Sequence, residues 1–150
     1  MNQQLPKRKP HRLKNFDYSS DGAYYITICT NNKEHILSNV IDHGPGEPAE
    51  IALTAIGKVV ERYAETIPGI DKYVIMPNHV HLIIIKTNGK PLSSDIRSFK
   101  TLVTKQLGYS IWQGSFYDHV TRSESDYLTK WKYIDDNPAK WVPGPYDYRE

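Results

Sequence analysis

The stretch IDKYVIMPNHVHLIIIK, residues 70–86, decides the fold. Its two runs of β-branched and aromatic residues meet at Pro77-Asn78, a pair suited to the middle of a tight turn. We therefore expect two adjacent strands that run antiparallel. The second run ends in LIII, residues 82–85, which does not alternate between apolar and polar residues. Such a run is typical of a central strand that is covered on both faces.

Strand and helix patterns alternate on either side of this pair. YYITICT, residues 24–30, is rich in aromatic and β-branched residues and predicts a first strand. Apolar residues recur at helical spacing over 52–67 and over 92–107, and Gly108 is a helix stop. In chain order we expect strand 24–30, a loop or short irregular hairpin over 39–50, helix 52–67, strands 70–76 and 79–86, helix 92–107, strand 111–120 and helix 123–137.

The order β-α-β-β-α-β followed by a further helix predicts an α+β fold. It is the order of a ferredoxin-like antiparallel sheet with helices on one face. Because strand 79–86 has the pattern of a strand covered twice, we expect the last helix to pack on the other face. A length of 150 residues with 39% hydrophobic residues fits one compact domain.

Basic residues are concentrated at the N-terminus. The first 14 residues hold five of the 19 basic residues and no acid, so the rest of the chain has 14 basic residues against 17 acidic ones. Such an arm either grips phosphates or is a solvated, disordered end. We divide the chain into a basic, flexible arm, 1–14, and a single domain, 15–150. The basic residues of the arm are Lys7, Arg8, Lys9, Arg12 and Lys14.

Several classes of protein are excluded by composition. No apolar run approaches the ~20 residues of a membrane span, and the N-terminus lacks the apolar core of a signal peptide. The single cysteine, Cys29, excludes an intrachain disulfide and a cysteine-cluster metal site. We therefore expect a cytoplasmic protein that does not associate with membranes.

The sharpest chemical feature is the pair His79 and His81 at the start of the second strand. Side chains two apart on a strand point the same way, about 7 Å apart along the chain, so two imidazoles can converge on one metal ion. A His-x-His pair also arises by chance, and strand histidines are often ordinary core or surface residues. The position of two polar rings at the start of an otherwise apolar strand favours a site.

Two stripes run along the predicted last helix. The apolar stripe is Tyr127, Leu128, Trp131 and Ile134, and the polar stripe is Asp126, Lys130, Tyr133 and Asn137. Core packing therefore does not explain Tyr133, and Asn137 follows one turn later on the same side. An amide oxygen there can complete a two-histidine site for Mg²⁺ or Mn²⁺. Asn followed by Pro is also a common sequence at the C-terminal end of a helix.

The histidine pair and the polar stripe together support one chemistry. A tyrosine hydroxyl, with a pKa near ~10, is a poor nucleophile at neutral pH. A metal that clamps a phosphodiester oxygen activates the electrophile instead. Attack by Tyr133 would form a phosphotyrosine link and release a 3′-hydroxyl. The phosphotyrosine link conserves the energy of the broken bond for rejoining. The alternative is a metal-activated water, which needs a general base, and Asp118 and His119 remain candidates for that base.

The segments MPNHVHLIII and WQGSFYDHVTRSESDYLTKWKYIDDNPAKW resemble the REP-associated tyrosine transposases. These are HUH-type single-tyrosine transposases related to those of insertion sequences that move as single-stranded DNA. The likeness spans roughly residues 12–141. It places the His-hydrophobic-His pair of the family on His79 and His81, the nucleophilic tyrosine on Tyr133 and the metal-binding amide on Asn137, where relatives often carry Gln.

This resemblance implies metal-dependent cleavage and rejoining of single-stranded DNA next to an imperfect hairpin, through a 5′-phosphotyrosine intermediate. It implies Mg²⁺ or Mn²⁺ as cofactor and a tyrosine helix near the histidine strand. Relatives include both monomers and dimers that share active sites, so a monomer and a homodimer both stay open. The alternatives are a hairpin-binding regulatory module without catalysis and a metal-dependent nuclease that uses water.

Two further groups are candidates for DNA contact. The resemblance favours phosphate binding by the basic arm. On helix 92–107, Arg97, Lys100 and Lys105 form either a face for the DNA backbone or a solvated helix surface. Trp112 either stacks on an unpaired base or packs in the core.

Overall fold

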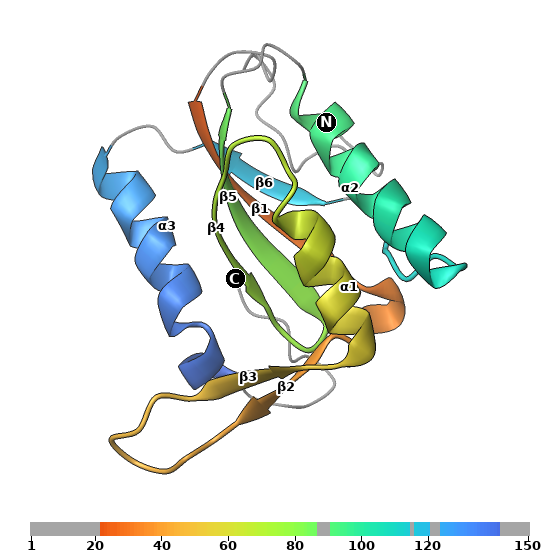
Figure 1. Cartoon of the computed structure of the whole chain (residues 1–150). Helices are drawn as coiled ribbons and strands as arrows, with labels where there is room; N and C mark the ends of the chain where they lie inside the picture. The colour runs from red at the N-terminus through yellow and green to blue at the C-terminus, as the bar shows by residue number, and fades with distance from the viewer. Residues whose placement is uncertain (1–21, 87–90, 115, 121–123, 142–150) are drawn as a thin grey trace.

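A four-stranded antiparallel sheet, in the order β4-β5-β1-β6, lies at the centre of the described residues (Figure 1). The structure is a computed structural model that describes residues 22–86, 91–114, 116–120 and 124–141, with the backbone alone for 117–120 and 124. The strands of the sheet are β1, Gly22–Cys29, β4, Ile70–Ile75, β5, His79–Lys86, and β6, Tyr117–Val120.

The strand β5 is interior to the sheet. It pairs antiparallel with β4 on one side and with β1 on the other, and β6 pairs with the far side of β1. In the β1–β5 pair Thr27 lies opposite His81 and Cys29 opposite His79. The predicted α+β fold with an antiparallel sheet is confirmed by this strand order.

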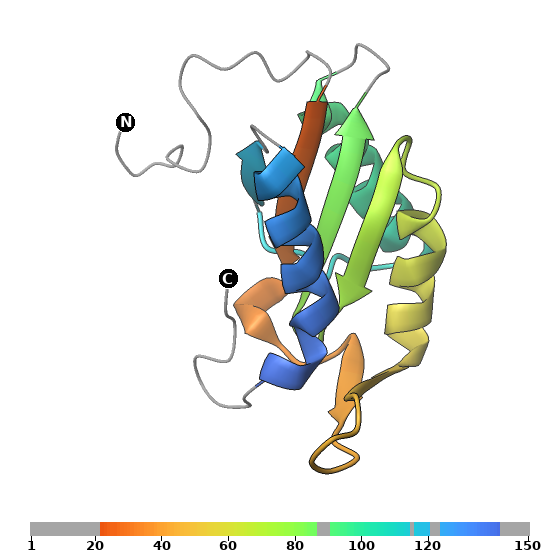
Figure 2. The same cartoon turned by 90° about the vertical axis from the view of Figure 1, so that its left-hand side faces the viewer.

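Helices cover both faces of the sheet (Figure 2). The helices α1, Ala55–Ala64, and α2, Leu92–Leu107, lie on one face, and α3, Glu124–Asp136, lies on the other. The larger hydrophobic core fills the α1–α2 side, where every second residue of β1 and β5 points, and the smaller cluster on the α3 side contains Tyr25, Ile83 and Ile134. The expectation that the last helix packs alone on the second face is therefore confirmed.

The two helices of the larger core start and stop at recognisable residues. The hydroxyl of Thr54 accepts a hydrogen bond of 3.0 Å from the Gly57 backbone N–H and caps α1. The predicted start at residue 52 was too early because Glu50–Leu53 forms a strand, β3. The helix α2 matches the prediction and ends at Gly108, which is left-handed with φ of 88°.

Two predicted segments differ in detail from the structure. Residues 39–50 lie in a hairpin of β2, Ser38–Ile41, and β3, outside the main sheet. The predicted strand 111–120 is wrong in its first half, because only Tyr117–Val120 forms β6. Ile111 and Trp112 are consecutive, yet both are buried in the α1–α2 core. A regular strand points consecutive side chains to opposite faces, so Ile111 and Trp112 do not belong to one. Among the described residues, this segment makes an isolated β-bridge between Trp112 and Thr30.

Some sequence predictions fall outside the described residues. These are the basic arm, Lys7, Arg8, Lys9, Arg12 and Lys14, and the side chains of Asp118 and His119. In the described part of the chain, no helix has the length and apolar character needed to span a membrane.

Candidate active site

His79 and His81 lie side by side on the face of β5 that α3 covers. Both are buried, and their ring centroids are 4.6 Å apart. The two rings are close because residues two apart on a strand have their side chains on the same face. The two imidazoles are thus close enough to serve one ligand.

Neighbouring oxygen atoms orient both rings through Nδ1. The Tyr25 hydroxyl lies 3.0 Å and the Thr27 hydroxyl 2.9 Å from Nδ1 of His81. The Asn78 side-chain oxygen lies 2.7 Å from Nδ1 of His79. An amide oxygen only accepts, so Nδ1 of His79 donates and the lone pair lies on Nε2. Metal-binding histidines are held in this way by a hydrogen bond at the other ring nitrogen.

The electrostatic surroundings keep His81 neutral. Its burial lowers the pKa well below 6.5, and the charges of His79 and Lys130 lower it further. At neutral pH the imidazole is therefore uncharged, which is the form that binds a metal.

The helix α3 brings Tyr133 to the histidine pair. The ring centroid of Tyr133 is 5.7 Å from that of His81 and 6.2 Å from that of Tyr25. Tyr133 is half-buried and packs against the cluster that contains Ile83 and Ile134. The structure thus brings together the tyrosine and the histidines that the sequence analysis singled out separately.

Asn137 is buried just beyond the end of α3. Its side-chain nitrogen donates to the backbone oxygen of Tyr133 at 3.3 Å, so the amide nitrogen is used within the chain. Four residues later the Trp141 ring lies 6.4 Å from that of His79. In the sequence Asn137 therefore lies between Tyr133, whose ring is near His81, and Trp141, whose ring is near His79.

Comparison with known proteins supports a specific family, although no protein-family model matches the sequence. An uncharacterized protein of Haemophilus influenzae is 32% identical, with 89% of each chain covered. The REP-associated tyrosine transposase of Escherichia coli is 35% identical over 53% of this chain and 50% of its own length. A second Haemophilus influenzae protein named for the same family is 25% identical over 83% of this chain and 74% of its own.

A solved structure agrees with these relatives. It is a REP-associated tyrosine transposase bound to a REP hairpin, with a TM-score of 0.65 and 22% identity over 91% of this chain and 79% of that one. Two of the curated relatives are thus named for the REP-associated tyrosine transposases, and the solved structure shows that this chain shares their fold.

The face that α3 presents to the sheet differs from the expected apolar stripe. Leu128 is 53% and Trp131 39% exposed, whereas Ile134 and Asn137 are buried. The stripe predicted the burial of Ile134 correctly but was wrong at Leu128 and Trp131, because the sheet surface under α3 is itself partly polar. It carries the two histidines and their hydroxyl partners, so polar residues of α3 face it and hydrophobicity does not identify the buried side.

Three contributors to the site, Tyr25, Thr27 and Lys140, were not found from the sequence, and a fourth, Lys130, was placed on the polar stripe without a role. Tyr25 and Thr27 alternate with apolar residues on β1, which was a usable signal, but the pairing of β1 with β5 was needed to place them. Lys130 lies with Nζ 5.2 Å from the Tyr25 ring centroid, and Lys140 with Nζ 5.6 Å from that of Tyr133. These two cations make the surroundings of the tyrosines electropositive.

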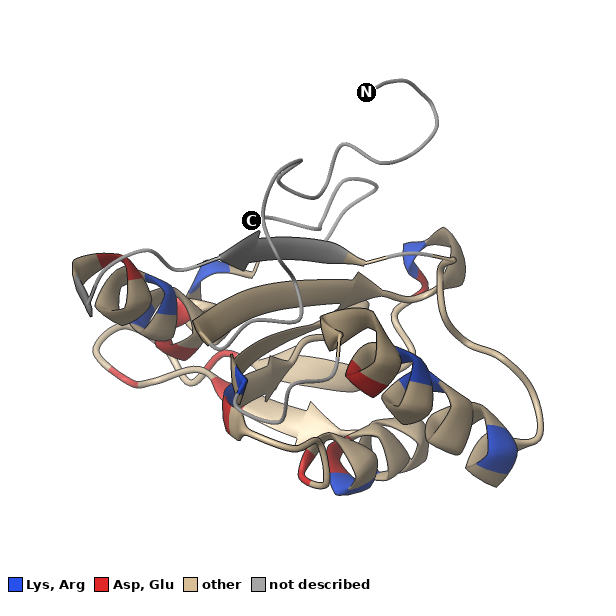
Figure 3. Ribbon diagram, turned by 90° about the horizontal axis from the view of Figure 1, so that it is seen from above, with Lys and Arg blue, Asp and Glu red and all other residues tan. Residues whose placement is uncertain are grey.

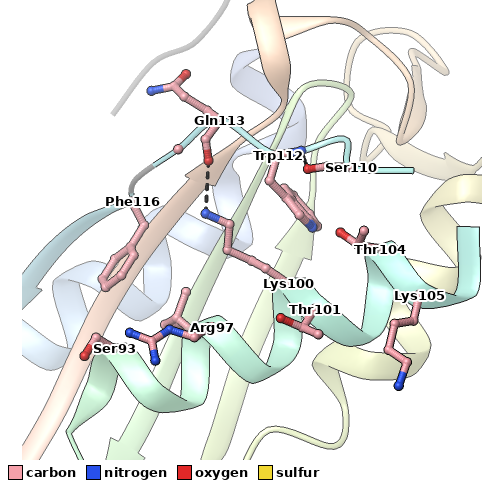
Figure 4. Close-up of a pocket in the computed structure, with 12 residues that line it drawn as sticks. Ser93, Arg97, Lys100, Thr101, Thr104, Lys105, Ser110, Trp112, Gln113 and Phe116 are labelled. Atoms are coloured by element: carbon pink, nitrogen blue, oxygen red, sulfur yellow. Dashed lines mark hydrogen bonds between the residues drawn. The ribbon is translucent and has the colours of Figure 1, made fainter. Parts of the chain in front are cut away.

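The DNA-contact candidates on α2 and at Trp112 lie away from the histidine and tyrosine site. Arg97, Lys100, Lys105 and Trp112 line one groove along α2, on the side of the sheet away from the histidines (Figure 4). The structure thus separates the predicted site residues into two groups, one on each side of the sheet.

Proposed function

We propose that this protein is a transposase that cleaves and rejoins single-stranded DNA next to a hairpin, with Tyr133 as nucleophile and with His79, His81 and Asn137 holding Mg²⁺ or Mn²⁺. The observation that carries the proposal is the 5.7 Å between the ring centroids of Tyr133 and His81, on one face of the sheet. The fold match to a relative bound to a REP hairpin supports hairpin DNA as the partner.

The donor set fits a divalent cation that also binds substrate. Among the described side chains, no group of three or more His, Cys, Asp or Glu residues could hold a metal ion. Two imidazoles and an amide oxygen would leave coordination positions for a phosphate oxygen and water. When bound, the cation would polarise the scissile phosphate.

The reaction itself is a phosphoryl transfer to the tyrosine. The Tyr133 oxygen attacks phosphorus and loses its proton, the bond from phosphorus to the 3′ oxygen breaks, and that oxygen takes up a proton. The products are a 5′-phosphotyrosine and a free 3′-hydroxyl, and attack by a 3′-hydroxyl reverses the step. Lys130 and Lys140 contribute positive charge where the phosphate would approach.

The test is covalent adduct formation on labelled single-stranded hairpin DNA with Mn²⁺. We expect the wild-type protein to form an adduct that survives denaturation, and EDTA to abolish it. Tyr133→Phe removes the attacking oxygen and is expected to form none. Tyr109→Phe, an exposed tyrosine just after α2, is the matched control and should behave as wild type.

Three outcomes would contradict this mechanism. An adduct formed by Tyr133→Phe would rule out this tyrosine as nucleophile. Cleavage without any adduct would indicate a nuclease that uses water. Tight hairpin binding without cleavage, indifferent to EDTA and to His79→Ala, would indicate a regulatory binding module.

A further inference from the structure

A groove of about 520 Å³ lies between α2 and described residues of the segment that follows it, 110–114 and 116 (Figure 4). This volume falls in the usual range of sites for small molecules, about 300–1,000 Å³. None of the residues that line the groove belongs to the histidine and tyrosine site. Because α2 and α3 cover opposite faces of the sheet, the two places are on opposite sides of the protein.

The charge of the groove favours an anion. Arg97, Lys100 and Lys105 line it, together with hydroxyl groups and no carboxylate. The acid on α2, Asp95, is buried and paired with Lys86 at 3.2 Å, so it does not offset the three cations. On α1 and α3, by contrast, acidic and basic residues are mixed (Figure 3).

Lys100 joins the two walls of the groove. Its Nζ donates a hydrogen bond of 3.0 Å to the backbone oxygen of Gln113, and Figure 4 shows the side chain reaching from α2 to the opposite segment. Burial lowers the pKa of Lys100. Arg97 and Lys105 are exposed and lie eight residues apart on the helix, about 12 Å along its axis. They are therefore free to contact separate phosphates.

Trp112 supplies an unused donor at the groove. The residue is 5% exposed, and its ring is fixed against Phe99 with 5.6 Å between centroids. Its indole N–H is buried and has no hydrogen-bond partner among the described residues. A buried donor left unpaired is unfavourable, so an acceptor atom reaching it would be favoured. Figure 4 shows the indole nitrogen turned toward Thr104 on the α2 wall.

We propose that this groove binds one unpaired nucleotide of the single-stranded DNA. An acceptor atom of the base takes the hydrogen bond of the Trp112 indole N–H, and Arg97 and Lys105 contact the flanking phosphates. A positively charged groove with an aromatic side chain is a common feature of sites for single-stranded nucleic acid. The inference rests on the proposed function only in taking DNA as the ligand. The groove holds the strand and has no part in the chemistry.

The first test measures binding of a labelled 12-nucleotide single strand without a hairpin, by fluorescence anisotropy in EDTA. We expect the double variant Arg97→Gln, Lys105→Gln to lose about 10-fold or more in affinity. Because each phosphate contact on a single strand contributes about 0.7 to the slope of log K against log salt, the slope should fall by about 1.4. The matched control, Lys58→Gln with Arg62→Gln on exposed positions of α1, removes the same charges and should change neither.

The second test examines the base. An abasic position scanned along the strand should weaken wild-type binding at one place, and Trp112→Phe should bind the intact strand as weakly as the wild type binds that abasic strand. Thermal unfolding checks that Trp112→Phe is folded. Thr104→Phe, which places a large side chain in the groove from the α2 wall, provides a second variant with the same expected loss.

The outcomes separate this inference from the proposed function. Equal affinity and equal salt slope for the α2 and α1 double variants would overturn it, as would wild-type binding by Thr104→Phe. If a mononucleotide at micromolar concentration competed with the strand for binding, the ligand of the groove would be a free nucleotide and the inference would be overturned. Because binding is measured in EDTA, the result does not depend on whether Tyr133 forms an adduct.

Discussion

The orientation of His81 depends on two hydroxyl groups of the neighbouring strand. Tyr25 and Thr27 both reach its Nδ1, and Thr27 lies directly opposite it in the β1–β5 pair. With that nitrogen engaged, Nε2 of His81 is the atom that can face a ligand. The residues that aim a histidine therefore belong to a different strand from the histidine itself.

Removing both hydroxyls should weaken metal binding. The double variant Tyr25→Phe, Thr27→Val keeps the ring and the branched side chain but leaves His81 without its orienting partners on β1. Loss of such outer contacts typically costs 10–100-fold in metal affinity, so we expect the Kd for Mn²⁺ to rise by about that factor. Titration calorimetry measures it. Ser38→Ala, which removes a buried hydroxyl bonded to Ile75, is the control, and an unchanged Kd in the double variant would contradict the prediction.

At the scale of elements, α3 is held to the sheet mainly by polar contacts at the edge strand β4. Tyr127 donates to Asp71, a bond that raises the pKa of Tyr127, and Lys72 pairs with Asp135 at 3.3 Å. Lys72 also lies 3.7 Å from the ring centroid of Trp131. Among the described residues of α3, only Ile134 is a buried apolar residue. Segments with so little apolar burial open more readily than the core.

We therefore expect α3 to exchange its amide hydrogens faster than α2, and Tyr127→Phe to accelerate exchange in α3 alone. Hydrogen–deuterium exchange with mass spectrometry distinguishes the peptides of the two helices. Tyr109→Phe removes an exposed hydroxyl elsewhere and should leave both helices unchanged. Equal protection of α2 and α3 in the wild type would show that the polar contacts hold α3 as firmly as a core helix.

The helix α1 depends on a close approach at Gly57. A Cβ added there would lie 1.9 Å from the backbone oxygen of Leu37, and a backbone atom cannot move aside as a side chain can. We expect Gly57→Ala to lower the free energy of unfolding by about 1–3 kcal/mol, as overpacking typically does. Urea denaturation measures it. Gly114→Ala, where an added Cβ meets nothing within 4 Å, should be close to neutral.

At the scale of the whole molecule, the two sides of the sheet have different tasks in our proposals. The α3 side holds the histidines and the tyrosine, and the α2 side holds the groove with its three cations. No residue is shared between them. Effects of substitutions at such separated sites should combine without coupling.

Separate tasks predict separate kinetic effects. The double variant Arg97→Gln, Lys105→Gln should need more DNA for half-maximal adduct formation, but its rate constant at saturating DNA should stay within about two-fold of wild type. Tyr133→Phe should show the opposite, with binding retained and no adduct. Single-turnover kinetics over a range of DNA concentrations checks both. A groove variant that remains slow at saturation would show that the two sides are coupled.

Local features were predictable because they depend on neighbours in the sequence. The bounds of β5, 79–86, and of α2, 92–107, follow from periodicity and stop signals within each segment. The prediction of a strand failed over the first half of 111–120 because Ile111 and Trp112 are placed by long-range packing that periodicity does not record. The prediction of the buried side of α3 failed at Leu128 and Trp131 for the same reason.

The α+β fold and the closeness of His79 to His81 follow from local sequence, because strand geometry places residues two apart on one face. The surroundings of the two histidines depend on long-range contacts. The pairing of β1 with β5 aims His81, and the docking of α3 onto a partly polar face sets Tyr133 beside it. The cations of α2 were likewise visible in the sequence, but only the burial of Trp112 beside them made a groove with an unpaired donor. These contacts join residues far apart in the chain, so their energies depend on the folded arrangement and leave no local pattern.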